Sequence, residues 1–405
     1  MWPHLAYDAC LKCQICLSAC PVYWVEEDFP GPKAAGPDWY RRAEAGDDTP
    51  LPHVDDCTFC QLCEKACPAD VPIAHLIAEH KARLSQSGRM RMRDFILKRP
   101  HWVARYPRLG QIRGGVAGWM GLSRQSRRPR IYRQRTVPRS PVRPPVQGRV
   151  GLFIDCFNRG YDEVVIWRAE ALLNLWGYEV VRLPAESRCC GAAAYAGGDS
   201  ALARRLGRET ALAIESVVRR EKPSVLVTLN ATCDGTLRDE WPTYYGLSIS
   251  LPVIPFEEFA WEKAPEEFWA VLRRAAPETS LTHTTCRGQV ARGNGLLSAL
   301  AKRAGWEAVH LPISCCGAGG SYAFKAEHEA TAHRLAETAL PAVSRAPSFL
   351  MVDSGTCAVH LQQVLGIDAR HPAYWLYERY QEGMKKNGGT ERALNADHHS
   401  GAPSA

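Results

Sequence analysis

The placement of cysteine constrains this chain more than any other feature of its 405 residues. All sixteen cysteines fall into four patterned groups, which leaves none over for a disulfide framework. The first eight form two copies of one pattern, C-x2-C-x2-C-x3-C-P. The first copy contains Cys10, Cys13, Cys16 and Cys20, and the second contains Cys57, Cys60, Cys63 and Cys67.

This pattern is typical of two-cluster ferredoxins, in which three thiolates bind one 4Fe–4S cluster and the fourth binds the other. The spacing therefore predicts two 4Fe–4S clusters. We expect the first cluster on Cys10, Cys13, Cys16 and Cys67, and the second on Cys57, Cys60, Cys63 and Cys20. Zinc is the alternative, but a zinc site takes four ligands and leaves the other cysteines of each run unexplained.

The remaining eight cysteines form a second duplicated pattern, a single cysteine, a Cys-Cys-Gly triplet and a final cysteine. Its copies contain Cys156, Cys189, Cys190 and Cys233, and then Cys286, Cys315, Cys316 and Cys357. Matching positions lie 130, 126 and 124 residues apart, which indicates a tandem duplication. Adjacent cysteines are often buried as small apolar residues, but two such triplets with flanking cysteines favour metal or redox sites. Glycine after each pair lets the backbone turn sharply beside a bulky ligand.

Apolar segments predict that each copy is a small α/β unit with parallel strands. The expected strands are 150–154, 179–183, 225–229, 281–285, 307–311 and 349–352, and the expected helices are 162–176 and 289–304. A long helix after the first triplet has a buried stripe of Leu202, Leu206, Ala213 and Val217. The cysteines then lie at strand ends, the edge where open α/β sheets bind ligands.

The predicted fold class is thus mixed, an α-helical two-cluster domain followed by two tandem α/β units. The expected boundaries are 1–88 for the ferredoxin-type domain, 89–148 for a basic segment and linker, 149–278 and 279–383 for the units, and 384–405 for a disordered tail. The chain lacks an 18-residue apolar run and a secretory signal pattern, so we expect a cytoplasmic protein without a transmembrane helix.

Charge is concentrated in residues 89–143. This segment holds sixteen Lys or Arg and one Asp, a net charge of +15, which leaves −8 for the rest of a chain whose total is +7. It also carries aromatic and aliphatic residues, and that mixture is typical of interfacial membrane segments. Pro and Gly divide it into short pieces, and 127–145 reads as an extended linker. Docking on an acidic partner protein is the second interpretation. Nucleic-acid binding is the third, and nothing in the cysteine pattern favours it.

Two ferredoxin runs followed by two Cys-Cys-Gly units resemble a family, the iron–sulfur subunits of membrane-associated dehydrogenases. That family includes the C subunits of anaerobic glycerol-3-phosphate dehydrogenases, the glycolate oxidase iron–sulfur subunit and heterodisulfide reductase subunits. The segments that carry the resemblance are Pro30–Asp38, Thr232–Pro242 and Cys315–Lys325. It covers about residues 5–380 and favours the anaerobic glycerol-3-phosphate dehydrogenase type among them.

The chain departs from that family at two matching positions. The family motif ends in Cys-x-x-Cys, whereas Asn230 and Ser354 stand here in place of the first cysteine. Each unit therefore has four cysteines, a set that could hold a four-thiolate cluster, a zinc ion or nothing. Ser354 could supply an oxygen ligand or act as a hydrogen-bonding residue at a strand end. His283 could ligate or hydrogen-bond a cluster sulfur, or be a polar strand residue.

The sequence lacks a G-x-G-x-x-G motif after a strand and a nucleophile–base constellation, so we expect no substrate-oxidising site on this chain. The resemblance implies an electron-transfer subunit that takes electrons from an FAD-containing partner and passes them to quinone, on the inner face of the cytoplasmic membrane. It makes sn-glycerol 3-phosphate the leading substrate of the complex. The alternatives are a subunit of a glycolate or lactate oxidase, a heterodisulfide reductase-like complex, and an assembly module with inert C-terminal units.

Overall fold

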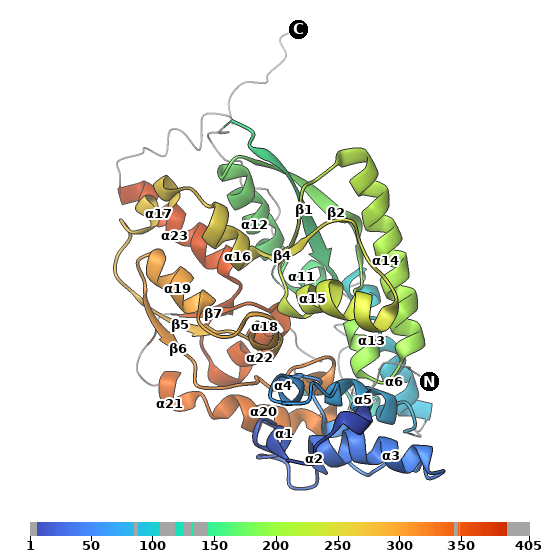
Figure 1. The fold of residues 1–405 in the computed structure, drawn as a ribbon. Helices are drawn as coiled ribbons and strands as arrows, with labels where there is room; N and C mark the ends of the chain where they lie inside the picture. The colour runs from blue at the N-terminus through green and yellow to red at the C-terminus, as the bar shows by residue number, and fades with distance from the viewer. Residues whose placement is uncertain are drawn as a thin grey trace.

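The N-terminal domain is small and helical. A computed structural model describes residues 6–84, 88–105, 118–124, 132, 145–343, 347 and 349–386. The elements of the domain are η1 (Tyr7–Ala9), α1 (Ile15–Ser18), α2 (Gly31–Lys33), η2 (Ala34–Asp38), α3 (Trp39–Glu44), η3 (Val54–Asp56), α4 (Leu62–Lys65) and α5 (Ile73–Lys81). They lie at one end of the molecule, beside both α/β units (Figure 1). The buried face of α5, with Leu76 and Ile77, forms the centre of its core.

The two cysteine runs fold into nearly identical loops. Each loop follows a single 3-10 turn, η1 or η3, and ends in a one-turn helix, α1 or α4. Lys12 and Gln14 adopt left-handed backbone angles in the first loop, and Phe59 and Gln61 do so in the second. Two left-handed residues among the five that separate the first cysteine from the third curve the backbone of each loop tightly.

Two short helices, α6 (Gly88–Leu97) and α7 (Pro100–Arg105), begin the basic segment. Pro100 starts the second helix, as the division into short pieces predicts. Not every basic residue of this segment is on the surface, because the side chain of Arg93 is only 1% exposed. It pairs with Asp94 and Glu327. Most of the expected linker at 127–145 lies outside the described residues.

The first α/β unit has a four-stranded parallel sheet in the order β2-β1-β3-β4. Its elements are β1 (Gly148–Asp155), α11 (Cys156–Tyr161), α12 (Glu163–Leu175), β2 (Tyr178–Arg188), α13 (Ala192–Ala196), α14 (Ser200–Glu221), β3 (Leu226–Thr228), α15 (Ala231–Gly235), η4 (Thr236–Tyr245), β4 (Val253–Pro255), α16 (Phe256–Lys263) and α17 (Glu266–Leu272). The expected stripe on α14 is buried at Leu202, Leu206 and Val217, while Ala213 is only half-buried. Strands and the helix over 162–176 occur where the apolar pattern predicts them, with β2 longer than expected.

The second unit repeats this sheet in the order β6-β5-β7-β8, again all parallel. Its elements are β5 (Thr279–His283), α18 (Cys286–Arg292), α19 (Leu296–Arg303), β6 (Glu307–His310), η5 (Tyr322–Phe324), η6 (Ala326–His328), α20 (Glu329–Glu337), α21 (Leu340–Val343), β7 (Phe349–Val352), α22 (Gly355–Leu365), β8 (Ala369–Arg370) and α23 (Pro372–Lys386). One helix over 289–304 is wrong, because Gly293 and Gly295 have positive φ angles and separate α18 from α19.

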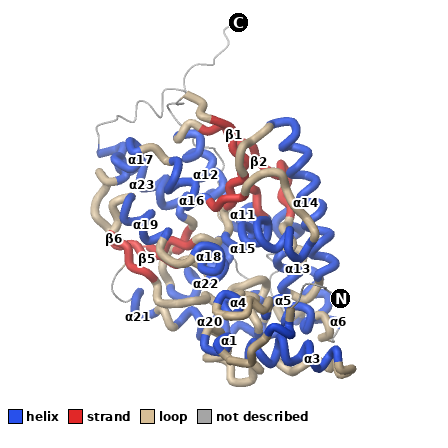
Figure 2. The backbone as a smooth tube through the Cα atoms, viewed as in Figure 1, coloured by secondary structure: helices blue, strands red, loops and turns tan. Residues whose placement is uncertain are grey.

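The two units share one hydrophobic core. Trp176 and Phe256 of the first unit belong to the same buried cluster as Leu297, Phe349 and Leu376 of the second. The C-terminal helix α23 packs against α12 and α17 of the first unit (Figures 1 and 2). The expected tail from 384 is wrong for its first three residues, because this packed helix continues to Lys386. The domain boundaries stay a prediction.

Candidate iron–sulfur centres

The thiols of the N-terminal domain gather in two groups, and each group contains the last cysteine of the other run. Cys10, Cys13, Cys16 and Cys67 line one small cavity of about 20 Å3. The second group surrounds Cys63, whose pKa is raised by burial and by neighbours that include Glu64 and the thiols of Cys60, Cys57 and Cys20. The structure thus brings together the two ligand sets that the spacing predicts. Their role as cluster ligands stays a prediction.

The environment of these thiols fits an iron–sulfur cluster. Burial, together with neighbouring thiols, raises the pKa of Cys16 to about 11 and that of Cys20 to about 12. A thiol with such a pKa ionises at neutral pH only beside a strong positive charge, and bound iron supplies that charge. The backbone N–H of Phe59 also lies 3.4 Å from Cys57 Sγ, where it can stabilise a ligating sulfur.

The eight C-terminal cysteines are all buried and form two matching groups. In the first, Cys190 Sγ lies 3.6 Å from Cys233 Sγ, and Cys156 is hydrogen-bonded to Cys189. In the second, Cys286 is hydrogen-bonded to Cys315 and Cys316 to Cys357. The backbone N–H groups of Gly191 and Gly317 each lie 3.4 Å from the first sulfur of their triplet. Each group can therefore present four thiolates to one metal centre.

The glycine of each triplet makes the sharp backbone turn that the sequence predicts, and close packing gives a second reason for it. Gly191 and Gly317 both have positive φ angles, +98° and +84°. A Cβ would lie 2.6 Å from the carbonyl oxygen of Ala203 in the first unit and 2.7 Å from that of Ala332 in the second. Glycine is therefore required by backbone angle and by close approach to the next helix, α14 or α20.

Asn230 and Ser354, which replace the missing cysteines, contact each other across the two units. The hydroxyl of Ser354 donates to Asn230 Oδ1 at 3.2 Å, and the two side chains are only 1% and 4% exposed. Ala231 N–H also donates to the carbonyl of Asp353 at 3.0 Å. Of the two roles considered for Ser354, this contact favours the hydrogen-bonding one. His283 is fully buried, and neither ring nitrogen has a partner among the residues that the structure describes.

One cavity joins the two Cys-Cys-Gly sites. Its volume is about 130 Å3, and six of the eight C-terminal cysteines line it. Three charged residues that the sequence reasoning missed, Asp155, Glu240 and Arg287, line it as well. Arg287 directly follows Cys286 at the start of α18, and an arginine next to a buried cysteine is the one signal that could have marked it.

The second ferredoxin loop packs directly on the second Cys-Cys-Gly site. Thr58 Oγ1 lies 3.9 Å from Cys315 Sγ, and Cys60 shares a buried cluster with Cys286 and Cys315. A Cβ at Gly319 would lie 2.4 Å from the carbonyl oxygen of Thr58, so the two backbones are as close as glycine permits. The thiols of the second ferredoxin group therefore adjoin those of the second unit.

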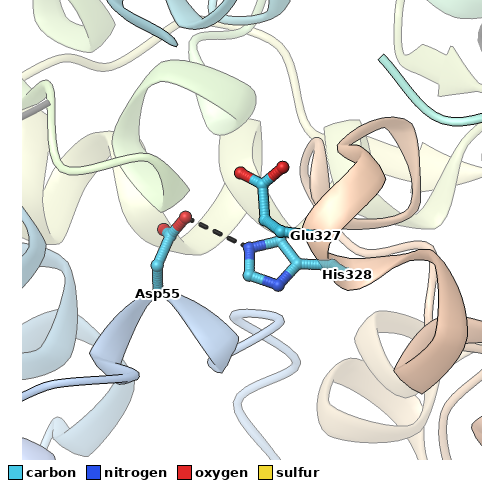
Figure 3. Close-up of side chains that lie close together, drawn as sticks. All are labelled: Asp55, Glu327 and His328. Atoms are coloured by element: carbon cyan, nitrogen blue, oxygen red, sulfur yellow. Dashed lines mark hydrogen bonds and ion pairs between the residues drawn. The ribbon is translucent and has the colours of Figure 1, made fainter. Parts of the chain in front are cut away.

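Ion pairs beside this contact hold the same two parts together. Asp55 faces Glu327 and His328 across the interface (Figure 3). Asp55 Oδ2 lies 3.2 Å from His328 Nε2 and 2.6 Å from Lys325 Nζ, and Lys81 Nζ lies 3.6 Å from Oδ1. Two lysines thus already balance the charge of the Asp55 carboxylate. This group of charged side chains is therefore an ion-pair network at a domain contact rather than a cation site.

Comparison with known proteins agrees with this geometry. Residues 6–71 match the family model of the 4Fe-4S dicluster domain, and residues 150–238 and 281–362 match that of the cysteine-rich domain. The chain is an iron–sulfur protein. The predicted fold class and iron–sulfur cofactors are thereby confirmed.

Two curated relatives cover this iron–sulfur protein nearly from end to end. The C subunit of the anaerobic glycerol-3-phosphate dehydrogenase of Escherichia coli strain K12 is 27% identical over 399 residues, which is 91% of this chain and 97% of that protein. The protein of the same name from Escherichia coli O157:H7 matches to the same extent. The resemblance stated from the motifs is confirmed. No helix among the described residues is long and apolar enough to cross a membrane.

Proposed function

We propose that this protein is the iron–sulfur electron-transfer subunit of a membrane-associated flavin dehydrogenase, with sn-glycerol 3-phosphate as its substrate. An FAD-containing partner oxidises the substrate, and this chain carries the electrons to quinone. The similarity to the glycerol-3-phosphate dehydrogenase subunits supports the choice of complex. The substrate is oxidised on the partner, so this chain supplies the sites between flavin and quinone.

The arrangement of the thiol groups carries this proposal. The first group reaches the surface, where Cys13 is exposed. The second group, which includes Cys60, adjoins Cys286 and Cys315 of the second unit. The cavity then joins that unit to the first one. Clusters held by the ferredoxin groups would supply one-electron carriers between a surface donor and the buried C-terminal sites.

The surface around the first group suits a protein partner. Leu11, Ile15 and Trp24 are 68%, 45% and 69% exposed beside the first cysteine run. Exposed apolar side chains gathered at one redox site are typical of a docking face. We therefore place the flavoprotein there, so that electrons enter at Cys10, Cys13, Cys16 and Cys67.

The basic segment supplies the proposed contact with the inner face of the cytoplasmic membrane. Met92, Phe95, Trp102 and Trp119 are between 45% and 55% exposed in a segment of high positive charge. Apolar and aromatic side chains among basic residues favour an anionic lipid surface.

The test is reconstitution of the complex. The chain is purified anaerobically with its flavoprotein partner, and quinone reduction is followed with sn-glycerol 3-phosphate, glycolate or lactate as donor. We expect quinone reduction with sn-glycerol 3-phosphate that requires both proteins. Reduction with glycolate or lactate alone would assign the other dehydrogenase class. Iron and sulfide contents near eight per chain would limit the clusters to the ferredoxin domain, and clearly higher contents would extend them to the Cys-Cys-Gly sites.

A further inference from the structure

The cavity between the two Cys-Cys-Gly sites has the walls of a ligand site. Apart from the cysteines, its lining is largely apolar and aromatic and includes Phe59, Phe157, Tyr161 and Phe324. Concave apolar sites with a few polar groups are the usual form of small-molecule sites in proteins. This one lies between thiol groups of both units, so a molecule bound there would contact both.

Arg287 offers the cavity unused hydrogen-bond donors. Its side chain lines the cavity and is only 8% exposed, and Nε and Nη1 have no partner among the residues that the structure describes. Its Nη2 donates to Glu240 Oε1 at 2.5 Å. Glu240 is fixed in turn by Gln61 at 2.9 Å and by Thr236 at 2.8 Å. Buried donors without partners cost free energy, and a ligand oxygen removes that cost.

The charge of the site favours a neutral ligand. Arg287 is already paired with Glu240, and the buried carboxyl of Asp155 also lines the cavity, so the wall presents N–H groups without a net positive charge. A carbonyl oxygen can accept these donors in apolar surroundings, whereas a carboxylate or phosphate would bring an unbalanced charge.

One wall of the cavity belongs to the basic segment. Ile96, Leu97 and Pro100 of α6 and α7 line it. The same two helices expose Phe95 and Trp102, which are 47% and 48% accessible and pack beside the Arg99 guanidinium. The helices α6 and α7 therefore contribute both to the wall of the cavity and to an exposed apolar surface at which a molecule could leave a lipid layer.

We propose that this cavity binds the quinone, with Arg287 donating to a quinone carbonyl oxygen. This assignment rests on the proposed function, because it places the quinone step of that function in this one cavity. Each quinone would take two electrons, one at a time, from the iron–sulfur clusters and two protons from water, and leave as quinol. Arg287 is then a binding residue for the acceptor, and Glu240 positions it.

The experiment uses the anaerobic holoprotein, reduced with dithionite and mixed with menadione or, separately, with ferricyanide. Oxidation of the clusters is followed by absorbance in a stopped-flow instrument. Arg287→Met removes the donors, and Ala193→Phe places bulk at a half-buried position in the cavity wall. Ala201→Phe adds the same bulk at an exposed position of α14 as a control. We expect both cavity variants to raise the half-saturating menadione concentration about tenfold or more, with ferricyanide oxidation unchanged.

Four outcomes separate the possibilities. The site is supported if menadione reduction saturates and the half-saturating menadione concentration rises in both cavity variants but not in Ala201→Phe. Wild-type kinetics with menadione in both variants would overturn it while leaving the proposed function intact. If Arg287→Met instead changes the cluster EPR spectrum and slows both oxidants, while Ala193→Phe is unaffected, Arg287 serves a cluster and the assignment is wrong. Failure of the wild type to reduce menadione, with normal ferricyanide reduction, would refute the proposed quinone step itself.

Discussion

Gly319→Ala should loosen the contact between the second ferredoxin loop and the second Cys-Cys-Gly site. Gly319 has no positive φ angle, so alanine adds no backbone strain there, and its effect is steric alone. Its Cβ would lie 2.4 Å from the carbonyl oxygen of Thr58, and this distance has to lengthen to at least 3.0 Å. Both sides are backbone, so no flexible side chain can absorb the shift.

The magnitude follows from the cost of overpacking a close contact, about 1–3 kcal/mol. Unfolding of a cluster protein is irreversible, so the rate of unfolding is the sound measure. If the contact is broken in the transition state for unfolding, that cost makes unfolding roughly 5- to 150-fold faster, since about 1.4 kcal/mol corresponds to a factor of ten. The rate is read from tryptophan fluorescence and cluster absorbance in urea under anaerobic conditions.

Gly88→Ala is the matched control, because a Cβ at Gly88, the first residue of α6, meets nothing within 4 Å. We expect it to unfold at the wild-type rate or more slowly, since alanine favours a helix. A second readout follows the function. Because Thr58 Oγ1 lies 3.9 Å from Cys315 Sγ, Gly319→Ala should also slow electron transfer from the ferredoxin clusters to the acceptor. Equal unfolding rates for the two alanine variants would refute the reasoning that this close approach constrains the fold.

Three further predictions concern other parts of the path. Ser354→Cys restores the cysteine that the family motif has, so the EPR signal of the C-terminal sites in the reduced protein should differ from that of the wild type. A spectrum identical to that of Ser354→Ala would show that the side chain at this position cannot reach a cluster. Burial opposes the charge of His328, but hydrogen bonds to Asp55 and a second carboxylate outweigh it and raise its pKa. The stabilisation of the folded protein by His328 is therefore complete below about pH 6.5 and is lost as the pH rises through the raised pKa. The unfolding rate of His328→Gln divided by that of the wild type should then fall as the pH rises through this range. A ratio that does not change with pH would contradict this linkage. Ile15→Lys, on the exposed apolar face, should slow electron transfer from the flavoprotein about tenfold without changing reduction by dithionite, while Leu212→Lys on α14 has no effect; equal rates would place the donor elsewhere.

The elements that sequence predicts well are those encoded by a few adjacent residues. Cysteine spacing alone gives the grouping of Cys67 with the first run and Cys20 with the second, because short loops fix where neighbouring thiols point. The strands β1 and β7 occur where buried apolar runs predict them. The prediction of one helix over 289–304 is wrong because it follows the apolar periodicity and overlooks Gly293 and Gly295. The positive φ angles of these two glycines end one helix and precede the next.

The parts that sequence does not predict depend on surfaces that meet only in the folded chain. Thr58 and Cys315 are 257 positions apart, and no local sequence pattern predicts that they contact each other. Arg287 and Glu240 likewise come from different units. Arg93 stands in a run of basic residues that reads as surface, yet it is buried because Asp94 and Glu327 pair with it. Charge composition describes a segment as a whole, whereas burial is decided residue by residue by distant partners.

The two duplications in this chain use repetition differently. In the N-terminal domain, each predicted ligand set takes one cysteine from the other loop, so neither predicted set is complete within one loop. In the C-terminal part, each unit keeps its own four thiols, and what the copies share is the boundary between them. Asn230 and Ser354 occupy equivalent positions and hydrogen-bond to each other there. The two residues that stand in place of the family's cysteines are therefore in contact with each other, and Asn230 Oδ1 also accepts from Thr232 N–H at 3.1 Å. That contact lies in the lining of the cavity to which we assign the quinone, so the residues that depart from the family motif also shape the proposed acceptor site.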